Sequence, residues 1–338
     1  MDRTLFATGS ATSPAGGVRA VLEASAAAVI QGDVACLAVV MGTEGSTYVR
    51  VGAMALFGSS SGQVGWLSGG CLEPAIERSA ISAARQQRIE WLDIDTRDDE
   101  ALFCGYAVEC RGRLRIALIP LQAMPGWNEL VVAWRAGVDE LRIEVDVNGG
   151  VSGGLAGGEQ QRWSMPAAAL PEPWANEEAR SWRVSIAAPP KALMVGAGPE
   201  TSVLLPLLRD LGWTTTLVDH RTRWAPLMCL ADVALELAPQ AALLSLQSSQ
   251  FDAALVMYHN FELDREPLAA LASSDIGFVG LLGPKRRRGD LFAVLPADAR
   301  VALLPRLHSP VGLDLGGRGP ATIALNIAAQ LHTIRPSA

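Results

Sequence analysis

The fold of the C-terminal half is decided by one stretch of sequence, ALMVGAGPET at residues 192–201. An apolar run that ends at Val195 is followed at once by Gly196-Ala197-Gly198 and then by a predicted helix over residues 200–211. Asp219 closes the next apolar run. A strand, a glycine turn and a helix N-terminus in this order hold the phosphates of a dinucleotide, and an acidic residue after the second strand holds a ribose hydroxyl. The stretch therefore predicts a dinucleotide-type domain that begins near Lys191.

Strand and helix signals alternate through residues 191–338. The predicted strands are residues 192–195, 214–218, 253–257 and 276–282, and the predicted helices include residues 200–211 and 320–331. This alternation predicts a Rossmann-like, doubly wound parallel sheet with helices on both faces.

The glycine turn departs from the usual dinucleotide pattern. Thr201 replaces the third glycine, and Pro199 and Glu200 bring bulk and negative charge into the loop. No His or Tyr with the spacing of a hydride-transfer site follows the turn. An NAD(P)-dependent oxidoreductase is therefore kept as the alternative hypothesis, with NAD(P) as its cofactor.

Polar residues follow several predicted strands of this domain. His220, His259 and the stretch from His308 to Asp314 each come after an apolar run. Because ligands bind outside the carboxyl ends of parallel strands, these positions predict a polar cleft at that edge of the sheet.

The first part of the chain predicts a separate α/β domain over residues 1–122. Its predicted helices cover residues 21–30 and 75–88, and its predicted strands cover residues 35–40, 53–57, 63–67, 90–94 and 114–120, with a loop at 42–48. Residues 123–190 are rich in Trp, Pro and Gly and include a glycine-rich hairpin at 148–158. We interpret them as a β-rich connecting extension.

Gly69-Gly70-Cys71-Leu72-Glu73 joins a predicted strand to the helix at 75–88. Pro74 suits the first turn of a helix, and Glu73 suits the positive end of the helix dipole. Helix N–H groups stabilise a thiolate, so Cys71 is predicted to be a partly exposed nucleophile or soft ligand. The competing interpretation is a small buried residue in a tight turn.

Gly45, Ser46 and Thr47, with Arg50 and Gly52 after them, lie between two predicted strands. Hydroxyls, loop N–H groups and a guanidinium together suit an anion. A plain polar hairpin connection explains the same residues nearly as well.

Composition excludes several classes of protein. The 338 residues are 49% hydrophobic and 19% charged, with a formal net charge of −7. This charge gives nucleic acid and anionic membranes no attractive field. No apolar segment is long enough to span a bilayer, and the N-terminal residues do not have the pattern of a signal peptide, so we expect a cytoplasmic protein.

The cysteine count predicts reduced thiols. Five cysteines at wide spacing do not make a disulfide framework. Cys104 and Cys110 lack the spacing of a zinc site, so no zinc is expected.

These motifs together resemble the XdhC/CoxI family, the xanthine dehydrogenase accessory factors, over nearly the whole chain. The matching segments are Gly45-Ser46-Thr47 with Arg50 and Gly52, Gly69-Gly70-Cys71-Leu72-Glu73, Gly196 and Gly198 with Asp219 and Arg221, Gly280 to Gly283, Pro310 to Gly316, and Pro320 with Ile323-Ala324. Several spaced motifs in one order are far more specific than any one of them.

The resemblance implies an accessory factor without turnover of its own, a chaperone that binds molybdenum cofactor, protects it during sulfuration and hands it to a molybdenum hydroxylase of the xanthine dehydrogenase type. The cargo would be molybdopterin or its cytosine dinucleotide form. Cys71 would lie closest to the metal or its sulfur, as a transient molybdenum contact, since molybdenum favours sulfur ligands. The candidate cofactor-binding residues are Gly45, Ser46, Thr47, Arg50, Gly69, Gly70, Cys71, Glu73, Gly196, Gly198, Asp219, Arg221, His259 and Asp314.

The expected partners are the client hydroxylase and a cysteine desulfurase, and the expected assembly is a homodimer, the commonest closed assembly. A scaffold that binds only a partner hydroxylase or a sulfurtransferase is a third hypothesis.

Overall fold

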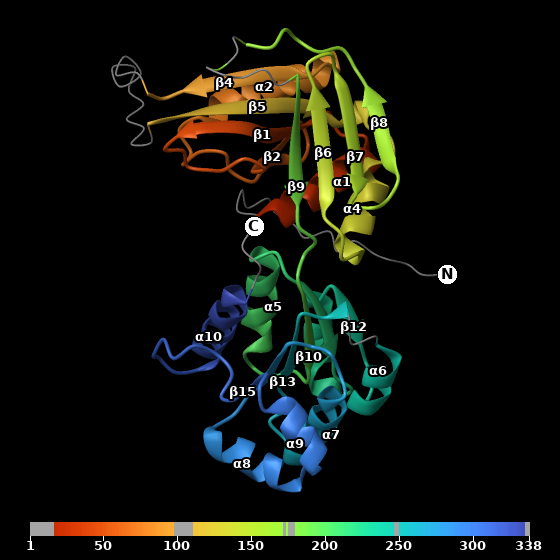
Figure 1. Cartoon of the computed structure of the whole chain (residues 1–338), viewed down its shortest axis with the longest axis vertical. Coiled ribbons are helices and arrows are strands. Elements are labelled where there is room, and N and C mark those ends of the chain that lie inside the picture. Colours follow the sequence, from red (N-terminus) through yellow and green to blue (C-terminus); the bar gives the residue numbers. More distant parts are fainter. Residues whose placement is uncertain (1–16, 98–110, 172–173, 175–179, 247–249, 335–338) are drawn as a thin grey trace. The chain divides into compact units, whose positions relative to one another are not determined.

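The computed structural model describes residues 17–97, 111–171, 174, 180–246 and 250–334. These residues form two compact units, divided between Ala188 and Pro189 (Figure 1). The described residues from 17 to 188 are called the N-terminal unit, and those from 189 to 334 are called the C-terminal unit.

A five-stranded antiparallel sheet organises the N-terminal unit, in the order β3-β2-β1-β5-β4. Its strands are β1 (Ala35–Gly45), β2 (Met54–Gly58), β3 (Gly62–Val64), β4 (Glu90–Asp95) and β5 (Gly112–Pro120). Side chains alternate between the two faces of a strand, and β1 buries both sets. Leu37 and Val39 face one core cluster, whereas Cys36 and Ala38 face another.

Helices cover both faces of this sheet. α2 (Glu73–Gln86) packs on the face that carries Cys36, with Ile76 and Ala80 in the shared core. α1 (Val18–Gln31) and α4 (Trp127–Ala136), which follows the short 3-10 helix η1 (Leu121–Ala123), belong to the core of the opposite face. The indole Nε1 of Trp127 donates to Ser25 Oγ at 2.8 Å, which ties α4 to α1.

A four-stranded antiparallel sheet, in the order β8-β7-β6-β9, completes the N-terminal unit. Its strands are β6 (Leu141–Asp146), β7 (Gly150–Leu155), β8 (Gln160–Ser164) and β9 (Ser181–Ile186). Its apolar side chains lie in the same core cluster as Leu37 and Val39 of β1. The predicted β-rich stretch after residue 122 is thus packed on the first sheet.

Two strand ends differ from the prediction for physical reasons. β1 continues to Gly45, where a loop was expected from residue 42, because Gly42–Gly45 pair with β5 as far as Gly112. β3 ends at Val64 and not at residue 67, because Gly65 adopts a left-handed φ of 86°.

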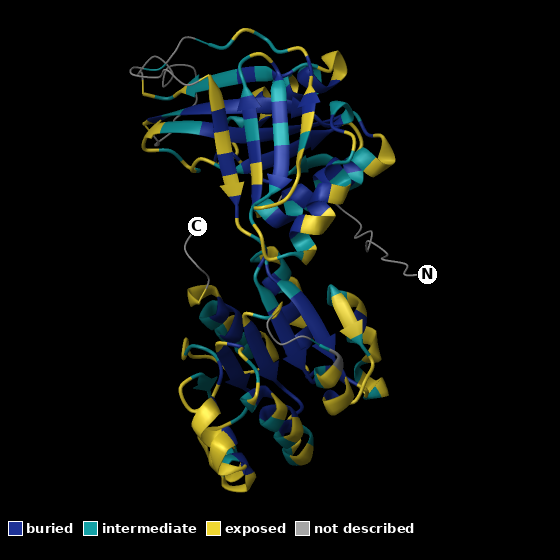
Figure 2. Ribbon diagram, turned by 45° about the vertical axis from the view of Figure 1, so that its right-hand side comes forward, coloured by how far each residue is buried: buried dark blue, intermediate teal, exposed yellow. Residues whose placement is uncertain are grey.

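The C-terminal unit contains the predicted parallel sheet, with six strands in the order β12-β11-β10-β13-β14-β15. Its strands are β10 (Lys191–Val195), β11 (Thr214–Val218), β12 (Val233–Leu235), β13 (Ala253–Val256), β14 (Phe278–Leu281) and β15 (Leu307–His308). The central strands are buried on both faces, as Figure 2 shows, which explains their continuous apolar sequences.

Helices lie on both faces of this sheet. They are α5 (Thr201–Asp210), the 3-10 helix η2 (Thr222–Leu230), α6 (Pro239–Ser245), α7 (Phe261–Ala272), α8 (Lys285–Val294), α9 (Ala297–Leu303) and α10 (Pro320–Thr333). One face carries α5, η2 and α10, and the other carries α6, α7, α8 and α9.

The chain leaves β10 toward α5 on one face and leaves β13 toward α7 on the other. β10 and β13 are neighbours in the sheet. The point where adjacent strands feed opposite faces opens a crevice at their carboxyl ends, and this topological switch point is where open α/β sheets bind ligands.

Candidate functional site

The predicted cysteine motif forms a turn, residues 65–73, that leads from β3 into α2; we call it the cysteine turn. A Cβ on Gly65 would lie 2.6 Å from Val21 Cγ2 and 2.7 Å from Met54 O, so the chain passes closely against α1 and β2 here. Gly70 has a φ of 104°, which side chains rarely adopt. Glycine at these two positions therefore permits the path that the turn takes.

Glu73 stabilises the cysteine turn through hydrogen bonds to its backbone. Its buried carboxylate accepts hydrogen bonds from the N–H groups of Leu67, at 3.1 Å, and Ser68, at 2.7 Å, and from the Ser68 hydroxyl. Ser68 Oγ in turn accepts from the N–H groups of Gly70 and Leu72, both at 3.2 Å. Because this network fixes the backbone around residue 71, Glu73 sets the position of Cys71 indirectly: it holds the turn that carries the cysteine.

Cys71 is half-buried, and its Sγ lies 3.9 Å from Ser68 Oγ. Cys36, by contrast, is fully buried under α2, and this burial raises the pKa of its thiol well above the ordinary value. Because a thiolate is the reactive form of cysteine, Cys36 is inert in the folded protein, and Cys71 is the thiol that the N-terminal motifs present.

Two exposed aromatic rings stand beside the glycines of the cysteine turn. A Cβ on Gly69 would lie 4.0 Å from Tyr48 Cε2, and a Cβ on Gly70 would lie 3.8 Å from Trp66 Cζ3. Tyr48 is 62% exposed and Trp66 is 37% exposed, unusual values for aromatic side chains in this unit. Sequence reasoning did not select either residue, although Trp66 directly precedes the motif and Tyr48 ends the predicted loop.

The loop that is predicted to bind an anion, residues 45–52, uses several of its hydrogen-bond donors within the protein. Ser46 N–H donates to Arg111 O at 3.1 Å, and Thr47 Oγ1 donates to Val49 O at 2.6 Å. A Cβ on Gly45, which has a φ of 73°, would lie 2.7 Å from Arg111 O. These contacts anchor the loop to the start of β5, while Arg50 is exposed. Tyr48 of this loop lies beside Gly69 of the cysteine turn.

The glycine loop of the C-terminal unit follows β10 as predicted, and its donors are also paired. Gly196 N–H donates to Val218 O at 2.8 Å, Ala197 N–H to Asp219 Oδ2 at 2.7 Å, and Gly198 N–H to Thr201 Oγ1 at 2.9 Å. A Cβ on Gly196 would lie 2.7 Å from Tyr258 Cγ. The close approach that this glycine permits is therefore to a buried tyrosine ring.

Asp219 lies at the carboxyl end of β11, and Arg221 holds its carboxylate through bonds at 3.0 and 2.6 Å. Burial alone would raise the pKa of Asp219, but the hydrogen bonds from Arg221 and Ala197 outweigh burial and keep it below the ordinary value. Arg221 also donates to Ala197 O and lies over the Tyr258 ring, 4.6 Å from its centroid. The acid and the base predicted to bind a ligand thus form a pair that joins the loops after β10, β11 and β13.

His259 follows β13 at the switch point and has a left-handed φ of 57°. Its Nε2 lies 3.5 Å from Oε1 of Glu200, a buried residue of the glycine loop. The structure thus brings the loops after β10, β11 and β13 together around Tyr258.

Asp314 is exposed and lies after β15, at the far end of the sheet from β11. His308 stacks on Phe278 with ring centroids 4.2 Å apart, and burial lowers its pKa. This histidine is thus part of the packing of β14 and β15.

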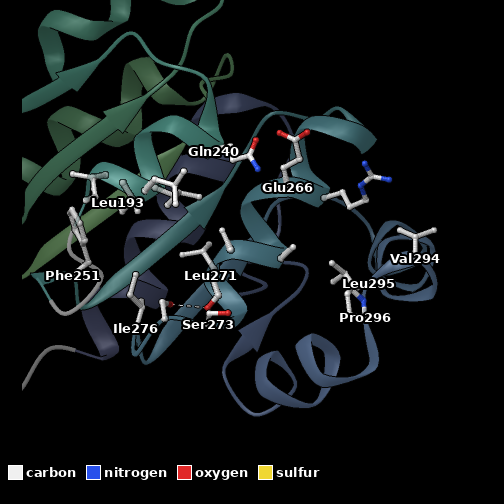
Figure 3. A pocket seen from close by; sticks show the side chains of 17 residues that line it. Leu193, Gln240, Phe251, Glu266, Leu271, Ser273, Ile276, Val294, Leu295 and Pro296 are labelled. Carbon is white, nitrogen blue, oxygen red and sulfur yellow. Dashed lines mark hydrogen bonds between the residues drawn. The ribbon is translucent and has the colours of Figure 1, made fainter.

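A separate apolar pocket of about 630 Å³ lies at the other end of the parallel sheet (Figure 3). Phe251 and Ile276, which precede β13 and β14, line it together with Leu295. Charged residues are found only at Arg265 and Glu266 among its lining residues. Because none of the predicted site residues lines this pocket, we place the candidate site at the cysteine turn and at the switch point.

The part of the chain that the structure describes contains no group of three or more His, Cys, Asp or Glu side chains arranged to hold a metal ion. No helix within the described ranges is long and apolar enough to cross a membrane. Cys104 and Cys110, whose spacing predicts no zinc site, lie outside the described residues.

Two family models match this chain. The model of the XdhC Rossmann domain matches residues 193–331, and the model of the XdhC and CoxI family matches residues 28–95. The first match contains the glycine loop and His259, and the second contains the cysteine turn and the loop with Tyr48.

Similar proteins are found over most of the chain. A Bacillus subtilis protein described as a probable subunit of xanthine dehydrogenase is 25% identical over 317 residues, which are 89% of this chain and 93% of that protein. "Uncharacterized protein YqeB" of Escherichia coli is 29% identical over 44% of this chain and 28% of its own length. A crystal structure of a xanthine dehydrogenase from Bacillus halodurans, 24% identical, aligns with a TM-score of 0.69 over 91% of this chain and 94% of that chain. The fold of this chain is thus shared with a solved structure.

Proposed function

Because the chain belongs to the XdhC and CoxI family, as a xanthine dehydrogenase accessory protein, we propose that it binds molybdenum cofactor as cargo and delivers it to a molybdenum hydroxylase. It would protect the cofactor while the terminal sulfur is added, with the client enzyme and a cysteine desulfurase as its partners. We expect it to work as a homodimer and without turnover of its own.

One observation carries the proposal: the cysteine turn presents a half-buried thiol on a backbone that Glu73 and Ser68 hold in place. A soft sulfur donor suits molybdenum and its sulfido group. A single thiol can bind such a cargo without enclosing it, which a protein that must release its cargo requires.

The surroundings of Cys71 also fit the organic part of the cargo. The exposed rings of Tyr48 and Trp66 lie beside Gly69 and Gly70, the two residues that precede Cys71, and offer flat apolar surface there. A pterin is a flat heterocycle, and aromatic side chains bind such rings by stacking. In this proposal Cys71 holds the metal end, the two rings hold the heterocycle, and Glu73 keeps the turn in shape.

Substitution of the thiol tests the proposal. We expect Cys71→Ala to bind molybdenum cofactor at least about tenfold more weakly than the native chain, since a charge-assisted or metal contact of this kind contributes more than about 1.4 kcal/mol. The measurement is equilibrium binding of added cofactor to purified full-length protein, followed by the fluorescence of the oxidised pterin.

Cys229→Ser is the matched control, because Cys229 is an exposed thiol of the C-terminal unit. It should bind the cofactor as the native chain does. Equal binding by Cys71→Ala and Cys229→Ser would remove Cys71 from the site.

An NAD(P)-dependent oxidoreductase is the alternative, and Asp219 after β11 is the observation that favours it. The paired N–H groups of Ala197 and Gly198 and the carboxylate of Glu200 at the glycine loop weigh against a pyrophosphate there. Titration with NADH and NADPH separates the two functions. Binding at micromolar nucleotide would support the dehydrogenase, and no binding at millimolar nucleotide would remove it.

A further inference from the structure

The apolar pocket of about 630 Å³ in the C-terminal unit takes part in neither candidate site. Pockets that bind small organic molecules in proteins enclose about 300–1,000 Å³. This one lies at the amino-terminal ends of the parallel strands, where residues of α6, α7 and the C-terminal end of α8 line it (Figure 3). Its size therefore suits a small-molecule ligand, and the groups around it determine the chemical class of that ligand.

Most of the pocket wall consists of hydrocarbon side chains from separate elements. Leu193 of β10, Leu271 of α7 and Leu295 after α8 are at most 4% exposed. Leu244 and Val294, which also line the pocket, are 84% and 50% exposed. The hydrocarbon surface thus continues from the buried wall to solvent. A ligand that covers this surface removes it from water, which favours binding.

The C-terminal end of α7 lines the pocket, and its backbone carbonyls are bonded within the protein. The last carbonyls of a helix lack partners inside the helix itself. Arg306 donates to Leu271 O at 2.9 Å, to Ala272 O at 3.0 Å and to Ile276 O at 2.6 Å. Ser274 Oγ also donates to Leu271 O, at 2.8 Å (Figure 3). This part of the wall therefore requires no hydrogen bond from a ligand.

The charged side chains that line the pocket balance one another. Arg265 and Glu266 are successive residues of α7, and Arg265 Nη2 also lies 3.0 Å from Glu262 Oε2. Gln240 of α6 adds a neutral amide. An ionised ligand group loses its hydration against a hydrocarbon wall, which costs far more free energy than the transfer of a neutral group. The pocket therefore selects against both anions and cations.

We propose that this pocket is a second binding site, for an uncharged and largely hydrocarbon small molecule whose apolar body lies against Leu193, Leu271 and Ile276. The inference goes beyond the proposed function, because none of the residues that line the pocket lies in the cysteine turn or at the switch point. Its test does not use molybdenum cofactor, so the failure of one proposal leaves the other standing.

Three probes with the same ring system test the chemical class. Equilibrium dialysis of the full-length protein at pH 7 is carried out with 2-naphthol, which is neutral, with 2-naphthoate, an anion, and with 2-naphthylmethylammonium, a cation. We expect saturable binding of one 2-naphthol per chain, at least about tenfold tighter than that of either ion, because only the ions lose a strong hydration on entering the pocket. The native chain should also melt at a higher temperature when 2-naphthol is present.

Two variants with matched controls test the location. Ala270→Trp places bulk over the pocket from an exposed position of α7 and should bind 2-naphthol at least about tenfold more weakly, whereas Ala321→Trp, at an exposed position of α10, should bind it normally. Leu244→Gln removes hydrocarbon from the opening and should also weaken binding. Leu304→Gln is its control, because Leu304 is 69% exposed and does not line the pocket.

All four variants should melt at the temperature of the native chain without ligand, because each changes an exposed side chain. Leu244→Gln keeps the location testable if Ala270→Trp does not fold. Binding of either ion as tight as that of 2-naphthol would overturn the inference, and so would the absence of saturable binding. Binding of 2-naphthol that the folded pocket variants leave unchanged would place the probe elsewhere and overturn it as well.

Discussion

Cys36 and Cys71 carry the same side chain in opposite surroundings. Cys36 points from β1 into the core under α2, and Cys71 lies half-buried on the cysteine turn, directly after two glycines. The difference follows from backbone position, since a central strand buries both faces and a glycine turn opens one side of the chain. The two thiols that the structure describes in the N-terminal unit therefore differ in exposure.

Asp33 is the residue that most clearly links charge to stability. It is 7% exposed and accepts hydrogen bonds from Ser59, Ser60 and Ser61 of the turn between β2 and β3. Burial alone would raise the pKa of its carboxyl, but these bonds outweigh burial and lower it from 3.8 to about 2. A lowered folded-state pKa stabilises the fold above the unfolded-state pKa, and the gain disappears as the pH falls through the folded-state pKa.

We therefore expect Asp33→Asn to lower the free energy of unfolding of the N-terminal unit by about 2 kcal/mol at pH 7, since one pKa unit corresponds to about 1.4 kcal/mol. The difference from the native chain should shrink between about pH 4 and pH 2. Calorimetric unfolding over this pH range measures it. Asp139→Asn, at an exposed position, is the control. A difference that does not change with pH would mean that the charge of Asp33 does not cause the stabilisation.

At the scale of elements, β4 and β5 are joined across the sheet by a buried ion pair. Arg115 on β5 is fully buried and bonds Asp93 on β4 at 2.9 and 2.7 Å. Trp174 donates its Nε1 to the same carboxylate at 2.8 Å and lies 4.9 Å from the guanidinium, measured from the ring centroid. Trp174, far along the chain from β4 and β5, is thus fastened to the first sheet at this pair.

Removing the acid from this pair takes away the carboxylate that accepts two hydrogen bonds from the buried Arg115 guanidinium. We expect Asp93→Ala to destabilise the N-terminal unit by about 3–5 kcal/mol. Asp95→Ala, on the same strand but in a surface pair with Arg97, should cost at most about 1 kcal/mol. Urea unfolding of both variants tests this. Equal losses of unfolding free energy in the two variants would show that the burial of Arg115 does not determine how much its ion pair stabilises the unit.

The sequence predicts the parallel sheet well because its signals are local: β10, β11 and β13 are short apolar runs, and each is followed by a turn and a helix. It predicts the second antiparallel sheet only as a β-rich stretch, and it misses α4, whose Trp127 and Trp134 were counted as linker residues. Those side chains are buried by contacts with α1 and the first sheet, which no local pattern reveals.

The candidate site was predictable to a similar degree. The positions of Cys71, Gly196, Asp219 and His259 at strand ends follow from the motifs. The exposed rings of Tyr48 and Trp66 and the contact of Glu200 with His259 depend on side-chain packing and could not be predicted. The sequence predicts Glu200 as the start of a helix and as a negative charge that disfavours phosphate in the glycine loop.

At the scale of the whole molecule, the two units differ in the side chains that their motifs present. The N-terminal unit offers a soft thiol with aromatic surface, and the C-terminal unit offers a buried carboxylate in place of a phosphate site.

The most direct test of this account is the identity of the small molecule that freshly purified full-length protein carries. Mass spectrometry of the material released on denaturation should find a phosphorylated pterin in amounts comparable to the protein, and should find it strongly reduced in Cys71→Ala but not in Cys229→Ser. A nicotinamide dinucleotide in place of the pterin, or a pterin content that Cys71→Ala leaves unchanged, would contradict the central claim.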